Sequence, residues 1–160
     1  MTRAILLAAI GAALFATDAR AVACSGATTP VAFAAYNVFG AGNVDSTGTV
    51  VVTCSKVVGD PSGGITVNYE VELGTGSSGN VTQRTMLSGA NTLNYNLYTN
   101  NARSQLWGNG INAPSVSASF SLSNATPSRN RSHTVYGRIP PLQDATVGLY
   151  GDNILVTIQY

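Results

Sequence analysis

The sequence has 160 residues, which is the length of a single domain. Charged residues make up only 9% of it, against roughly 25% in an average globular protein, and the net charge is +1. Nucleic-acid binding is excluded on these numbers, because it needs a clustered basic surface. The apolar fraction of 44% is sufficient for one core, so we expect a folded chain.

Residues 1–21 have the three-part pattern of a secretory signal peptide. A positive start ending at Arg3 precedes an apolar run over residues 4–16, and a polar stretch follows that ends in Ala19-Arg20-Ala21. As a helix the apolar run would span about 20 Å, against roughly 30 Å for a bilayer core, so no stable membrane span is expected. We expect cleavage after Ala21 and a mature domain over residues 22–160. A buried N-terminal helix is the alternative interpretation.

The two cysteines, Cys24 and Cys54, are expected to form a disulfide. Export places the chain in an oxidising compartment, and two cysteines allow one intramolecular pairing. The bridge would stabilise the domain by roughly 3 to 4 kcal/mol in the chain-entropy model. Lipidation at Cys24 is the alternative, because residues 21–24 weakly resemble a lipoprotein cleavage site; Asp18 and Arg20 separate them from the apolar run and count against it. Two cysteines and one histidine do not suggest a metal site.

Alternation of apolar and polar residues predicts strands along most of the chain and almost no helix. Every second residue is apolar in residues 65–73, the pattern of a strand with one buried face. The same pattern recurs at residues 116–122 and 154–160, and shorter strands are expected at 31–33, 49–54, 93–98 and 133–139. Clusters of Gly, Asn, Pro and Ser separate these segments and predict turns. Seven short strands indicate an all-β antiparallel sandwich in one domain.

Residue patterns that would support catalysis are incomplete. Residues 74–79 match the dinucleotide-binding pattern G-x-G-x-x-G, but no helix follows them to face a phosphate, so a flexible hairpin loop is expected there. His133 is the single histidine, and the sequence has no G-x-S-x-G nucleophile turn, so His133 is expected on the surface. We therefore expect neither enzymatic activity nor a cofactor.

Trp107 leaves a second class of function open. With the seven tyrosines it could form the aromatic platform of a secreted carbohydrate-binding module. Its place among Gly and Asn turn residues favours packing in the core or against a loop instead. Carbohydrate binding is the alternative function.

The second half of the sequence resembles a known family through five motifs in a fixed order. They are residues 84–86, residues 93–98 with Tyr95 and Tyr98, Trp107 with Gly108, the run Tyr136, Gly137, Arg138 and Pro140 with Gln143, and Tyr150 with Asp152. A Cys soon after the signal, a Val-rich strand ending in the second Cys and an alternating strand that contains Tyr match in the first half. The chain is similar to the spore coat protein U domain, whose family includes subunits of archaic chaperone-usher (Csu-type) pili.

This resemblance implies an incomplete immunoglobulin-like sandwich whose last strand is supplied by a partner. The implied partners are a periplasmic chaperone, an outer-membrane usher and other pilus or coat subunits, and the implied location is the periplasm and then the cell surface. A donated strand would add to an open sheet edge, with alternate side chains filling pockets. We expect that edge along the last strand, at Ile154, Val156, Ile158 and Tyr160.

The stretch before Cys24 departs from the pattern of subunits that polymerise. Such subunits carry an alternating apolar extension of about a dozen residues, which reaches about 40 Å. In the expected mature chain only Val22 and Ala23 precede Cys24. The expectation is a subunit that accepts a strand without donating one, hence a terminal or minor subunit of a pilus or coat, with a role in adhesion or biofilm formation.

Overall fold

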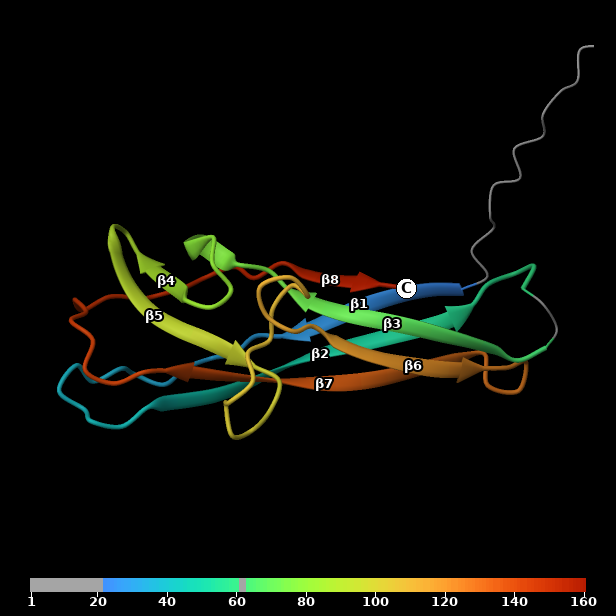
Figure 1. The fold of residues 1–160 in the computed structure, drawn as a ribbon, viewed down its shortest axis with the longest axis horizontal. Helices are drawn as coiled ribbons and strands as arrows, with labels where there is room; N and C mark the ends of the chain where they lie inside the picture. Colours follow the sequence, from blue (N-terminus) through green and yellow to red (C-terminus); the bar gives the residue numbers. More distant parts are fainter. Residues whose placement is uncertain (1–21, 61–62) are drawn as a thin grey trace, which may run out of the picture.

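The computed structural model describes residues 22–60 and 63–160, which form two antiparallel β-sheets (Figure 1). The larger sheet has the strand order β1-β2-β7-β5-β4, and the smaller sheet has the order β6-β3-β8. The strands are β1 Val22–Thr29, β2 Val44–Lys56, β3 Ile65–Leu73, β4 Arg84–Ser88, β5 Asn91–Tyr98, β6 Val116–Leu122, β7 Ser128–Ile139 and β8 Val156–Gln159. The predicted fold class, an all-β antiparallel sandwich, is confirmed. The expected signal peptide lies outside the described residues.

Strands β2 and β7 form the centre of the larger sheet. They pair without interruption from Val44 opposite Ile139 to Ser55 opposite Ser128. The predicted segments 49–54 and 133–139 are the parts of these longer strands in which the alternation is strongest. Val50 and Val52 are buried on the inner face of β2, where apolar side chains are removed from water.

The predicted disulfide is confirmed. Strand β1 pairs with β2 along its whole length, and this register places Cys24 directly opposite Cys54. Their sulfur atoms are bonded. The bridge therefore fixes the outer strand of the larger sheet to its neighbour.

The core lies between the two sheets. Alternate residues of β3 are buried, as the sequence pattern predicts, and they meet the inner faces of β2, β5 and β7. Trp107 is also buried, on the connection between β5 and β6, and its indole Nε1 donates a hydrogen bond to the Val71 carbonyl. The same connection joins the sheets: Trp107 N donates to Leu97 O on β5, and Leu73 N on β3 donates to Gly108 O.

Two expectations about single segments are wrong, and two strands are additional to those expected. Residues 31–33 belong to no strand, whereas β1 and β4 are strands that the sequence pattern did not predict. Residues 74–79 do not close a hairpin, because β3 lies in the smaller sheet and β4 in the larger one. They form a connection between the sheets that contains a short 3-10 helix, η1 Gly76–Ser78.

Candidate functional site

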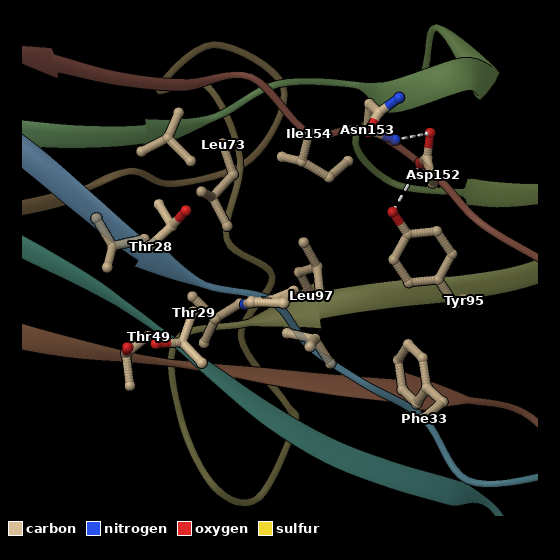
Figure 2. Close-up of a pocket in the computed structure, with 15 residues that line it drawn as sticks. Thr28, Thr29, Phe33, Thr49, Leu73, Tyr95, Leu97, Asp152, Asn153 and Ile154 are labelled. Atoms are coloured by element: carbon tan, nitrogen blue, oxygen red, sulfur yellow. Dashed lines mark hydrogen bonds between the residues drawn. The ribbon is translucent and has the colours of Figure 1, made fainter.

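Two adjoining apolar cavities open on the side of the sandwich between β1 and the segment that leads into β8. The first cavity has a volume of about 290 Å³ and lies between Thr28 and Thr29 on one side and Ile154 on the other (Figure 2); Val156 also lines it. The second has a volume of about 730 Å³ and is lined mainly by residues 31–39 and 145–150. Both cavities are lined by Val31 and Phe33, so we describe them together as the groove.

One side of the groove, here called the first wall, is formed by residues 30–36. Val31 and Phe33 are half-buried, while Ala32 and Ala34 are exposed, which is the alternation of an extended chain. Ser46 Oγ donates to the Ala32 carbonyl over 2.6 Å; apart from this bond, the backbone of residues 31–36 has no hydrogen-bond partner among the described residues. The first wall is therefore a strand in shape without a paired neighbour.

Two glycines allow the first wall to cross the larger sheet. A Cβ atom on Gly137 of β7 would lie 2.6 Å from Val31 Cγ1 and 2.7 Å from Phe33 Cζ. A Cβ atom on Gly48 of β2 would lie 2.6 Å from the Thr29 carbonyl oxygen. A side chain at either position would force the first wall to shift, so the two glycines allow the chain to pass this close to β2 and β7 after Thr29.

The opposite side of the groove, the second wall, is formed by residues 151–156. Gly151 exchanges two backbone hydrogen bonds with Leu87 of β4, and Gly74 N donates to Leu155 O beside β3. The second wall thus begins at the edge of the larger sheet and ends at the edge of the smaller one. Ile154 and Val156 line the groove, whereas Leu155 between them is 73% exposed.

A row of three side chains crosses the groove from wall to wall. The Phe33 ring meets the edge of the Tyr95 ring, with 6.0 Å between centroids. Tyr95 Oη then donates to Asp152 Oδ2 over 2.7 Å, as Figure 2 shows. Burial and the neighbouring Asp152 carboxylate raise the pKa of Tyr95, so the phenol keeps its proton. Asp152 Oδ1 accepts hydrogen bonds from Ser77 N and Ser77 Oγ, which ties η1 to the second wall.

Arg84 is fully buried behind this row. Its guanidinium donates to the carbonyl oxygens of Leu73, Gly74 and Trp107 and to Asn96 Oδ1. Desolvation lowers the pKa of Arg84. Because its donors are directed at backbone carbonyls, Arg84 holds the end of β3 in place, and the sequence pattern gave no indication of this role.

One end of the groove is held by Tyr36. Tyr36 Oη accepts a hydrogen bond from Gln143 N over 2.8 Å and donates to the Pro140 carbonyl over 3.1 Å. The first wall is thereby fixed to the turn after β7. Tyr150 also lies at this end, with its ring in the lining of the second cavity.

The structure brings some of the predicted residues to the groove and leaves others elsewhere. Ile154 and Val156 lie in its lining, and Ile158 contacts Gly26 of β1. Tyr160 is 42% exposed and outside the lining. Of the motif residues, Tyr95, Leu97 and Asp152 line the first cavity, Met86, Leu93 and Tyr150 line the second, and Gln143 closes one end of the groove. The remaining ones, Tyr98, Tyr136, Arg138, Pro140, Trp107, Gly108 and Gly137, support the sheets around it.

Arg138 illustrates this supporting role. It forms a two-pronged ion pair with Asp45 across β7 and β2, and Arg103 approaches the same carboxylate at 3.3 Å. The hydrogen bond from Arg138 lowers the pKa of Asp45. The Arg103 guanidinium also lies over the Tyr136 ring. These contacts hold the β5–β6 connection against the larger sheet, away from the groove.

The expectation that His133 lies on the surface is wrong. Its Nε2 atom is 2.9 Å from Tyr69 Oη, and its ring meets the edges of Tyr69 and Trp107. On β7 it occupies the same face as the buried Val135, so it points between the sheets and is half-buried.

In the part of the chain that the structure describes, no group of acidic, His or Cys side chains is arranged to hold a metal ion. Within residues 22–60 and 63–160, no helix is long and apolar enough to cross a membrane.

Comparison with known proteins identifies the class. The family model of the Spore Coat Protein U domain matches residues 10–157, so the chain belongs to that family, as the motifs predicted. The fold is similar to that of a chain in the crystal structure of the CsuC–CsuE chaperone–tip adhesion subunit pre-assembly complex from the archaic chaperone-usher Csu pili of Acinetobacter baumannii. The TM-score is 0.51 at 18% identity, and the match covers 87% of this chain and 40% of that chain. None of the curated proteins matches the sequence significantly.

Proposed function

We propose that this chain is an exported structural subunit of a chaperone-usher pilus or a related surface coat. Its groove binds one extended segment of a partner, first a periplasmic chaperone and then a neighbouring subunit. On this proposal residues 1–21 direct export, residues 22–160 form the subunit domain, and an outer-membrane usher assembles it at the cell surface.

The groove is the observation that carries the proposal. An extended segment placed between the walls would find unpaired backbone groups on the first wall and the edge strand β8 beside the second. Strand addition uses such groups for affinity and side-chain pockets for specificity. Phe39 and Leu149, which line the second cavity, are 90% and 96% exposed, as expected for side chains that a partner covers. Family membership and the similarity to a structure from a chaperone–subunit complex support the same assignment.

The carbohydrate-binding alternative is disfavoured, because the tryptophan on which it depends is not accessible to a sugar. Trp107 is only 1% exposed, and its indole nitrogen is bonded to the Val71 carbonyl. A sugar ring cannot stack on it without unfolding the β5–β6 connection. The family and the geometry therefore both favour a structural subunit.

Co-expression with a periplasmic chaperone from the same genome tests the proposal. We expect a one-to-one complex on size-exclusion chromatography, and loss of that complex in Ile154→Lys, because the substitution places a charge in the groove lining. Leu155→Lys is the matched control, since this neighbouring side chain is 73% exposed and lies outside the lining. Circular dichroism establishes that both variants fold. Equal capture of Ile154→Lys and Leu155→Lys would reject the groove as the binding site.

A further inference from the structure

The carboxylate of Asp152 gives the groove a preference among partner segments. Resting on the proposed function, we infer that the bound segment presents a hydrogen-bond donor, either a hydroxyl or a cationic side chain, where it crosses the row formed by Phe33, Tyr95 and Asp152. An acidic side chain is excluded at that one position. The occupant is thus an extended segment with apolar side chains on both sides of one donor.

The row lies where the two cavities adjoin. Phe33 lines both cavities, Tyr95 and Asp152 line the first, and Tyr150, two residues before Asp152, lines the second. Side chains on one face of an extended strand repeat about every 6.6 to 6.8 Å. A segment lying along the groove therefore places one inward side chain over the row and its apolar neighbours in the cavities on either side.

Asp152 retains the capacity to accept a further hydrogen bond. Its Oδ1 atom accepts from Ser77 N, Ser77 Oγ and Asn153 N, whereas Oδ2 accepts only from Tyr95 Oη among the described residues. A carboxylate oxygen has about two lone-pair sites, so by this count Oδ2 can accept one more donor on the side that does not pack against Gly76. Among the residues that the structure describes, Asp152 is the single charged one that lines either cavity.

Arg84 lies behind the row and donates no hydrogen bond to Asp152 among the described residues. It is 0% exposed, and its donors are directed at the carbonyl oxygens of Leu73, Gly74 and Trp107 and at Asn96. Arg84 therefore interacts with Asp152 through charge alone and does not reach an occupant of the groove. The charge that an incoming side chain meets is the carboxylate.

Synthetic peptides of about ten residues test the inference; in extended form such a peptide is about 33 Å long. The parent has Val at alternate positions, with Ser and Asn between them and both ends blocked. Three derivatives carry Thr, Lys or Glu in place of the central Val, and binding to the full mature protein is measured by titration calorimetry. We expect the Thr and Lys peptides to bind about tenfold more tightly than the Glu peptide at low salt, and the Lys-to-Glu ratio to shrink as salt is raised.

Three variants identify the responsible group. Asp152→Asn should reduce the Lys-to-Glu ratio to near unity. Asp144→Asn, an exposed aspartate outside both linings, should leave it unchanged. Asp152→Ser also removes the carboxylate while keeping a hydroxyl near Tyr95, so it should reduce the ratio as well and provides a second readout if Asp152→Asn fails to fold. Equal binding of the Lys and Glu peptides to the wild type would overturn the inference and leave the proposed function standing. Failure of every peptide, the Val parent included, would count against the proposed function itself.

Discussion

Gln143 takes the place of a strand partner for Asn94. Asn94 N donates to Gln143 Oε1 over 2.8 Å, and Gln143 Nε2 donates back to Asn94 O over 2.9 Å. The β5–β7 register runs from Tyr98 opposite Tyr136 to Asn96 opposite Arg138, and its continuation would place Asn94 opposite Pro140. Proline has no N–H to donate, so the side-chain amide supplies the pairing that the backbone cannot.

Replacing this amide should destabilise the fold without changing the core. Gln143→Ala leaves the backbone groups of Asn94 without partners, so we expect the free energy of unfolding to fall by about 1 to 3 kcal/mol. Urea denaturation followed by tryptophan fluorescence measures it. Gln83→Ala removes an exposed amide that makes no side-chain hydrogen bond among the described residues, and it should change the value by less than about 0.5 kcal/mol. Equal effects of the two substitutions would contradict the pairing.

Reduction of the disulfide should destabilise the edge of the larger sheet. Cys24 and Cys54 are 30 residues apart, so the bridge should stabilise the domain by roughly 3 to 4 kcal/mol in the chain-entropy model. The Cys24→Ser/Cys54→Ser double variant should lose this amount in denaturant unfolding. Adding a reductant should lower the midpoint for the wild type and leave it unaltered for the variant. An unaltered wild-type midpoint would show that the bond does not stabilise the fold.

Arg84 should be far more sensitive to substitution than the exposed arginines. Arg84→Met leaves the carbonyl oxygens of Leu73, Gly74 and Trp107 buried without a donor, and we expect a loss of about 3 kcal/mol or more. Arg129→Met is the control, because Arg129 is exposed and should tolerate the change within about 0.5 kcal/mol. The measurement is the thermal or urea unfolding midpoint of each variant. Comparable midpoints would mean that the carbonyl groups find other donors.

His133 should make stability depend on pH in the mildly acidic range. Burial, with a smaller contribution from Arg131, lowers the pKa of His133 from 6.5 in the folded protein, so the unfolded chain binds the proton more readily. The contribution of His133 to stability is therefore complete above pH 6.5 and decreases as the pH falls below that value. Urea unfolding at a series of pH values measures the slope.

The control for this pH dependence is His133→Gln. It cannot titrate and should flatten the slope between about pH 5 and 6.5, above the range in which carboxylates protonate. A slope of equal size in His133→Gln would assign the effect to another group.

Most of the strands could be predicted, because a strand with one buried face has apolar residues at every second position of its sequence. Residues 65–73 alternate without a fault, and β3 occupies the same residues. Strand β1 was missed because it lies at a sheet edge with a mostly exposed, small-residue sequence and therefore has no apolar period. Residues 31–33 gave the opposite error. The alternation of residues 31–33 indicates that one face of the segment is packed against the protein. It does not indicate whether the backbone is hydrogen-bonded to a neighbouring strand.

The candidate site was predictable only in part. The family motifs pointed to Tyr95 and Asp152, yet the row that they form with Phe33 depends on the first wall crossing β7 at Gly137. This crossing depends on how closely the first wall and β7 pack in the folded chain, and it produces no periodic pattern in the sequence. His133 was misplaced for a related reason, because a polar residue at the end of an apolar period has the same sequence signature whether it is solvated or bonded to Tyr69.

The departure of residues 30–36 from the larger sheet divides the sandwich into two regions of unequal local stability. Next to the disulfide, β1 is fully paired with β2, and Ile158 lies against Gly26. Beyond Thr29 the first wall is held mainly by side chains, and its unpaired amide hydrogens should exchange with solvent far faster than those of β2. A segment bound along the first wall would slow this exchange, because a ligand stabilises the closed state that binds it relative to open states that do not.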